Sequence, residues 1–188
     1  MRRPANEVQL ADFDRIGVFG ASGSGKSTLA KRVADQTERH YLAMDPLNFL
    51  PDWVERPLAD AEQMLREMVR EERWVSDGNY AKLRHIIGPR VQLVIWLDYS
   101  FARVLWQLLL RTVVRSAKKE ELWPGCRETW RMSFFSRESI LLWMIKTHGR
   151  KRRELRSLEG RPEWDNITVV SFRNPNQTDR WLLQNGLK

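Results

Sequence analysis

A glycine-rich segment near the N-terminus carries the strongest chemical signal in the sequence. It reads Gly-Ala-Ser-Gly-Ser-Gly-Lys-Ser over residues 20–27 and matches the pattern G-x-x-x-x-G-K-[ST] at every defined position. Glycines allow successive backbone N–H groups to converge on one anion, while the lysine supplies a point charge and the serine hydroxyl a hard ligand for Mg²⁺. The segment therefore predicts a nucleoside-triphosphate site made of Gly20, Ala21, Ser22, Gly23, Ser24, Gly25, Lys26, Ser27 and Thr28, in which Lys26 is catalytic and Ser27 binds the metal.

The elements around this segment are those that a phosphate loop needs. A short apolar strand precedes it and an amphipathic helix follows it, which is the context that confirms the motif. Similar strand patterns recur along the chain and alternate with helical ones, so we predict an α/β fold with a mainly parallel sheet. The expected strands are 15–19, 41–44, 73–76, 91–97 and 166–172, and the expected helices are 26–38, 58–73 and a last one that Asn174-Pro175 caps and that ends before Gly186.

About seventy residues between the fourth and fifth strands show no strand pattern. Helical patterns cover 100–115 and 128–148, separated by Pro124-Gly125. The stretch from Arg103 to Arg153 holds thirteen Lys or Arg and four Glu, a charge of +9, so the rest of the +8 chain carries about −1. We expect a single domain over 1–188 with a polar, loosely docked leader over 1–14 and a basic helical lid inserted at about 112–155.

Composition excludes several classes of protein. No apolar run approaches the roughly 20 residues of a membrane-spanning helix, and the N-terminus lacks the apolar core of a secretory signal. Cys126 is the single cysteine, which excludes an intramolecular disulfide and fits a reducing compartment. We therefore expect a cytoplasmic protein without a membrane partner; the sequence does not indicate its oligomeric state.

Three segments, taken with the phosphate loop, resemble a known family. Trp74-Val-Ser-Asp-Gly-Asn-Tyr80, Val94-Ile-Trp-Leu-Asp98 and Pro124-Gly-Cys126 are similar to segments of the P-loop nucleotide kinases of the adenylate kinase type, and within them of the adenylate-kinase-like proteins labelled topology modulation proteins. The resemblance implies a five-stranded parallel sheet in the order 2-3-1-4-5 with a mobile lid. It also implies ATP and Mg²⁺ as cofactors, and Asp77 as a catalytic residue near the phosphates that positions the metal directly or through water. Arg111 falls where these enzymes place a catalytic arginine at the base of the lid, and Arg150 and Arg153 lie where the lid returns, so that one of them clamps phosphates. Asn79 is expected to contact the substrate, and Asn174 and Pro175 lie where related kinases wrap the nucleotide base.

The acceptor region departs from that family. Adenylate kinases carry one arginine shortly after the second strand and another at the end of the segment that matches residues 77–81. In this sequence, residues 45–49 after the second strand contain no cation. Lys82 and Arg84 lie beyond the position of the second arginine. This argues against an acceptor like AMP. Asp45 instead suggests a hydroxyl acceptor that a carboxylate orients or deprotonates; Asp45 and Asp77 are alternatively turn residues, and the lid arginines are alternatively solvated charges.

Two hypotheses of function follow. The first is an ATP- and Mg²⁺-dependent phosphotransferase acting on a small molecule, because a kinase needs the cationic groups that the lid supplies. The second, which we favour less, is a nucleotide-gated ATP-binding protein or ATPase whose basic lid engages nucleic acid or another acidic partner. A GTPase is disfavoured because the sequence contains no N-K-x-D motif.

Overall fold

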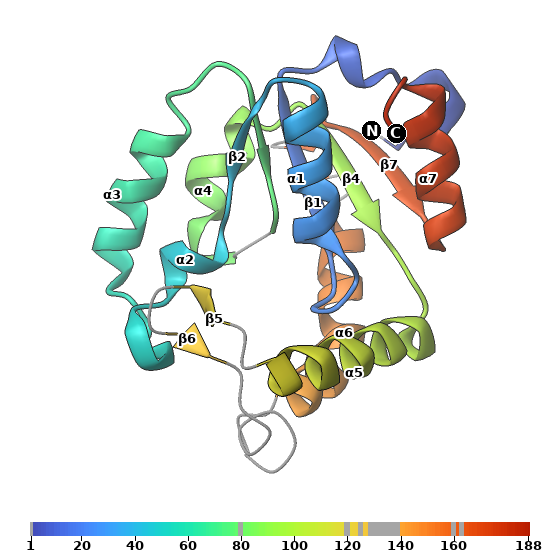
Figure 1. Ribbon diagram of the computed structural model, residues 1–188. Coiled ribbons are helices and arrows are strands. Elements are labelled where there is room, and N and C mark those ends of the chain that lie inside the picture. The colour runs from blue at the N-terminus through green and yellow to red at the C-terminus, as the bar shows by residue number, and fades with distance from the viewer. Residues whose placement is uncertain are drawn as a thin grey trace.

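The computed structural model describes residues 2–78, 81–118, 121–123, 126–127, 140–158, 161 and 164–188. Five parallel strands form one sheet in the order β2-β3-β1-β4-β7, which confirms the predicted α/β fold and strand order (Figure 1). The strands are β1 (Arg15–Gly20), β2 (His40–Leu42), β3 (Trp74–Ser76), β4 (Leu93–Leu97) and β7 (Thr168–Phe172). Because β1 is central, the segment that follows it lies between the ends of its neighbours β3 and β4.

Helices cover both faces of the sheet, because its central strands are apolar on both sides. Ile16 and Val18 of β1 pack in one buried cluster with α1 (Lys26–Gln36) and α7 (Pro175–Gln184). Phe19 packs in a second cluster with α3 (Leu58–Met68) and α4 (Arg84–Ile87). The remaining short helices are α2 (Asp45–Asn48) and the 3₁₀ turns at Ala5–Glu7, Leu10–Asp12, Pro51–Trp53, Ala81–Leu83 and Gly88–Arg90.

Local predictions hold with small shifts. The Asn174 side chain accepts a hydrogen bond of 3.0 Å from the Gln177 N–H, so Asn174 caps α7 as expected. The expected strand over 41–44 starts and ends earlier, at His40 and Leu42. The helix expected over 58–73 ends at Met68, because Val69 leaves helical geometry as the chain turns toward β3.

The insertion between β4 and β7 differs from its prediction. It contains α5 (Phe101–Lys118), α6 (Ile140–Leu158) and a short antiparallel pair of strands, β5 (Glu121–Trp123) and β6 (Cys126–Arg127), which are too short to show an alternating pattern. The predicted end of the helix over 128–148 was wrong, because α6 continues through Gly149 to Leu158. The first part of that prediction, residues 128–139, lies outside the described residues. A single interior glycine costs a helix only about 1 kcal/mol, and buried Met144 and Leu158 anchor α6 on both sides of it.

Figure 1 shows α5 and α6 beside the carboxyl ends of the strands, where the phosphate loop also lies. No helix among the described residues is long and apolar enough to span a bilayer.

The N-terminal segment is firmly docked, which corrects the expectation of a loose leader. Val8 and Leu10 are buried, and the Arg3 N–H donates to the Val169 carbonyl at 3.0 Å. The Trp181 indole N–H of α7 donates to the Ala5 carbonyl at 2.8 Å. The segment closes one end of the core because its two apolar side chains complete the cluster under α7.

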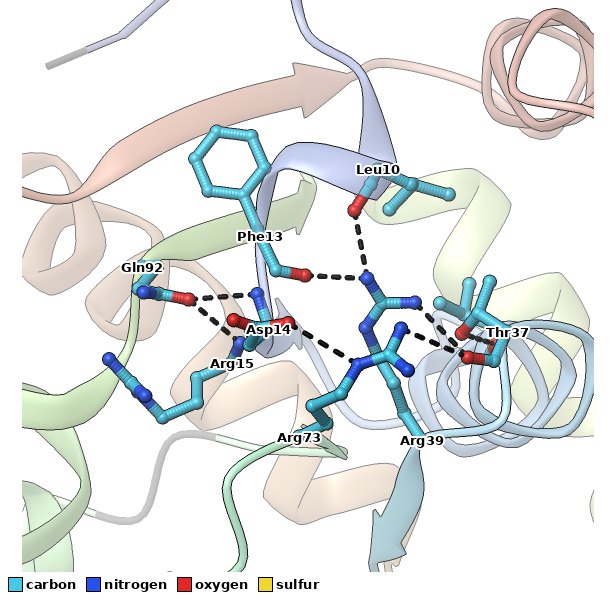
Figure 2. A network of polar contacts seen from close by, with 9 residues as sticks. Leu10, Phe13, Asp14, Arg15, Thr37, Arg39, Arg73 and Gln92 are labelled. Carbon is cyan, nitrogen blue, oxygen red and sulfur yellow. Dashed lines mark hydrogen bonds and ion pairs between the residues drawn. The ribbon is translucent and has the colours of Figure 1, made fainter.

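A buried arginine holds this segment at the amino ends of the strands, remote from the phosphate loop. Arg39 is 6% exposed, and its guanidinium donates to the carbonyls of Leu10 and Phe13 at 3.0 and 2.6 Å (Figure 2). Arg73 beside it pairs with Asp14 at 3.3 Å, with both side chains about half exposed. The two arginines therefore make a matched pair in which one is buried and one is not.

We predict that Arg39→Met lowers the free energy of unfolding by about 1.5–3 kcal/mol, because two carbonyls lose a charged donor. Arg73→Met is the control and should cost less than about 1 kcal/mol, since its ion pair is exposed. Urea denaturation of the two variants measures the difference. Equal losses would show that Arg39 does not hold the segment.

Candidate functional site

The phosphate loop joins the carboxyl end of β1 to the start of α1 and folds as a tight bend. Gly23 and Gly25 have φ angles of 86° and 92°, a conformation that side chains disfavour. A Cβ on Gly23 would lie 2.8 Å from the Cβ of Leu108 on α5. Glycine at position 23 therefore allows both the bend and the close packing of the insertion against it.

Lys26 and Ser27 occupy the first turn of α1, where backbone N–H groups and the helix dipole favour an anion. The Lys26 ammonium donates to the Ala21 carbonyl at 3.1 Å across the loop. Ser24 is buried, and its N–H donates to the same carbonyl at 3.1 Å. Ser27 and Thr28 are exposed at the mouth of the bend, so the arrangement is a cradle for phosphate groups.

A buried carboxylate lies beside the loop, at the end of β3. Asp77 is 2% exposed and accepts hydrogen bonds from the Met44 N–H at 2.8 Å and the Tyr41 hydroxyl at 2.7 Å. The Ser27 side chain lies close enough to Asp77 to lower its pKa. The structure thus places Ser27 and Asp77, the two residues predicted to position the metal, near each other, and adds Tyr41, which the sequence analysis missed.

Burial sets the protonation of this group. Desolvation raises the pKa of Asp77, opposed by its hydrogen bonds from Ser27, Met44 and Tyr41, and the nearby negative charge of Asp45 raises it further. Burial, followed by the charge of Asp77, also raises the pKa of the Tyr41 hydroxyl, which therefore remains a donor. A cation at this site would lower the pKa of Asp77 and fix it as a carboxylate.

The donors fit Mg²⁺. This ion prefers hard oxygen ligands and commonly binds through one or two carboxylates together with substrate phosphates and water. A serine hydroxyl and a carboxylate near each other, at the mouth of a phosphate cradle, are such a donor set. The observation that supports the fit is the burial of Asp77 among hydrogen-bond donors, none of which is a basic side chain among the described residues that bond to it.

A second carboxylate, Asp98, follows β4 on the other side of β1. Leu97 is the register partner of Gly20, so Asp98 lies next to the start of the loop. The Arg152 guanidinium of α6 donates to both Asp98 oxygens, at 2.5 and 2.9 Å, and Arg156 lies 3.6 Å from one of them. The Asp98 side chain is only 9% exposed, so the insertion is tied to the sheet beside the phosphate cradle.

Comparison with known proteins agrees with this geometry. Residues 16–98 match the model of the ATPase family associated with various cellular activities (AAA), and no curated protein gives a significant match. Solved structures share the fold, and three of them are described next. The chain has a P-loop kinase-like fold, with a five-stranded parallel sheet and helices on both of its faces.

The first of these structures, shikimate kinase from Acinetobacter baumannii in complex with shikimate, has a TM-score of 0.53 and 16% identity and covers 98% of this chain and 100% of its own. Shikimate kinase from Bacteroides thetaiotaomicron has a TM-score of 0.51 and 15% identity, covering 90% and 94%. A gluconokinase from Sinorhizobium meliloti 1021 has a TM-score of 0.50 and 17% identity, covering 91% and 90%. The solved structures that share the fold of this chain thus include small-molecule kinases.

The other residues predicted for the site are distributed as follows. Asp45 is the first residue of α2, close enough to Asp77 to influence its pKa. Asn174 and Pro175 begin α7 just beyond β7, at the same edge of the sheet as the loop. Arg111 is half-buried on α5, whereas Arg150 and Arg153 are exposed on α6. Asn79 lies outside the described residues.

Arg152 and Arg156 are therefore the α6 arginines that contact Asp98 at the edge of the cradle, and the sequence analysis did not single them out. Helical spacing offered a signal, because residues 152 and 156 are one turn apart and face the same side. The partner, Asp98, was visible only as a residue after a strand.

Proposed function

We propose that this protein is an ATP- and Mg²⁺-dependent kinase that transfers a phosphoryl group to a hydroxyl of a small molecule. The observation that carries the proposal is the phosphate loop with buried Asp77 beside it, near enough to Ser27 for the Ser27 side chain to lower its pKa. Asp45 lies nearby as a second, half-buried carboxylate. Kinases of small hydroxylated molecules among the structural neighbours support the choice of acceptor class.

In this mechanism the loop N–H groups and Lys26 hold the outer phosphates of ATP and offset the negative charge that builds up during transfer. Ser27 and Asp77 hold Mg²⁺, which when bound supplies positive charge to the phosphate oxygens. Asp45 orients the acceptor hydroxyl and accepts its proton. Arg111, Arg150 and Arg153 belong to the proposal as lid cations, and Asn79, Asn174 and Pro175 as substrate and base contacts.

An acceptor screen tests the proposal. The protein is incubated with ATP labelled at the γ-phosphate and Mg²⁺, together with sets of hydroxy acids, sugars, nucleosides and nucleotides. We expect label in an organic product from a hydroxylated compound, and loss of that transfer in Asp45→Asn. Release of label as inorganic phosphate alone, across all four sets, would contradict kinase activity.

The charge distribution favours one second candidate, the nucleotide-gated protein that binds nucleic acid. The segment from Arg103 to Arg153 carries a charge of +9. The resemblance of this sequence to the topology modulation proteins is part of the same alternative. A protein that neutralises several nucleic-acid phosphates loses affinity steeply as salt rises, whereas turnover of a small molecule depends on salt weakly. Titration of labelled DNA at several salt concentrations between about 50 and 200 mM separates the nucleic-acid-binding hypothesis from the kinase hypothesis. In either case we place the protein in the cytoplasm.

A further inference from the structure

The contact between α6 and the sheet leaves a surplus of positive charge beside the phosphate loop. Two guanidinium groups, from Arg152 and Arg156, face one carboxylate, Asp98. Asp98 adjoins the strand end from which the loop begins. One positive charge is thus left over at the rim of a cradle that already holds Lys26, which favours a polyanion.

The geometry of the pair orients Arg152. Its contacts with Asp98 use Nε and Nη2, one edge of the planar guanidinium, in a two-point bond that fixes the plane of the group. The Arg152 side chain is 38% exposed while Asp98 is 9% exposed. One edge of the guanidinium is therefore held by a buried anchor, and the group retains N–H donors on its Nη1 side for a second anion.

The helix that carries Arg152 is itself anchored on another side. Glu154 pairs with Arg84 of α4 at 2.6 Å, and Leu158 is buried in the core cluster under α4. Leu155 packs against the same cluster. Residues 152–158 are thus attached to both the sheet and α4, so Arg152 is placed at the cradle before any nucleotide binds.

We propose that Arg152 is a pre-positioned phosphate-binding residue for ATP, and that Asp98 is the positioning residue that orients it. The role of Arg152 in phosphoryl transfer rests on the proposed function, whereas its role in ATP binding requires no acceptor. A fixed cation stabilises the charge on the outer phosphates without the reorganisation that a free side chain requires. Arg150 and Arg153, exposed on the same helix, do not share this support.

The first arm of the test measures affinity for Mg·ATP by calorimetry in Arg152→Ala and in Lys146→Ala, its matched control, which removes an exposed cation from the same helix. We expect the dissociation constant to rise about 10-fold or more in the first and less than about 2-fold in the second, as for loss of one charge-assisted contact. Added guanidinium ion should restore part of the loss in Arg152→Ala alone. Equal affinities in the two variants would overturn the proposal.

The second arm separates positioning from folding. Asp98→Asn retains the shape of the side chain and removes the charge that orients Arg152, so we expect the dissociation constant for Mg·ATP to rise in the same direction as in Arg152→Ala. Arg152→Lys, which retains the charge and loses the two-point contact, should show the same weakening if Arg152→Ala fails to fold. A lowered melting temperature with unchanged affinity for Mg·ATP would assign Asp98 a structural role only. If the wild type labels no acceptor, the kinase proposal fails, while the affinity arm still decides the role of Arg152.

Discussion

Lys26→Ala is expected to lower the rate of phosphoryl transfer by about 10²–10³-fold, the loss typical when one fixed donor to a developing charge is removed. The Lys26 ammonium reaches across the loop to the Ala21 carbonyl at 3.1 Å, which places it inside the bend. Alanine favours the first turn of a helix no less than lysine, so α1 should remain intact. Initial rates with the acceptor found in the screen measure the effect.

Lys31→Ala is the control for this variant. Lys31 is exposed on the same helix, so its removal takes away one positive charge without touching the loop. The control should transfer phosphate at nearly the wild-type rate, and both variants should retain the circular dichroism spectrum of the wild type. Full turnover by Lys26→Ala would remove Lys26 from the mechanism.

Asp77→Asn is expected to lower the rate of Mg²⁺-dependent phosphoryl transfer by about 10²-fold or more. The same change is expected to raise the free energy of unfolding at neutral pH. Transfer falls because the amide is a poor ligand for the metal beside Ser27. Stability rises because a buried carboxylate without a full countercharge resists ionisation, as the raised pKa of Asp77 shows. The asparagine oxygen can still accept from the Met44 N–H, and its amide can donate to the Tyr41 oxygen.

The sign of the pH dependence follows from linkage. Since the pKa of Asp77 is higher in the folded than in the unfolded chain, the folded wild type binds this proton more tightly. Its stability therefore falls as pH rises from the ordinary aspartate pKa through the raised value. The advantage of Asp77→Asn in melting temperature should be full above that window and vanish below it.

Thermal melts over a pH series without Mg²⁺ measure this advantage, and Asp35→Asn, an exposed change on α1, is the control. Addition of Mg²⁺ with ATP should stabilise the wild type and Asp35→Asn more than Asp77→Asn. An Asp77→Asn protein that is less stable than the wild type at every pH would show that the carboxylate is a structural anchor.

The sequence predicted the parts of the fold and site whose signals are local. The phosphate loop is contiguous, and the strands around it are apolar runs that need no knowledge of their partners. The Asn174 cap is likewise decided within four residues. Local patterns therefore sufficed to predict the strands of the five-stranded sheet, and the resemblance to nucleotide kinases supplied the order of these strands.

Contacts between distant segments were not visible. Tyr41 meets Asp77 across 36 residues and Arg152 meets Asp98 across 54, and no local pattern pairs either residue with its distant partner. The N-terminal segment was expected to be loose because it is polar, yet its two apolar residues, Val8 and Leu10, pack under a helix from the other end of the chain. Packing of Met144 and Leu158 likewise carried α6 through Gly149, where local propensity favours an end.

The central claim is that the bend between β1 and α1 binds the phosphates of a nucleoside triphosphate. Isothermal calorimetry of the purified wild type with ATP, in the presence and absence of Mg²⁺, tests it most directly. We predict saturable binding at a single site that Mg²⁺ strengthens and that Lys26→Ala weakens severely. The absence of measurable binding at millimolar ATP with Mg²⁺, by a protein that retains its fold, would contradict the account.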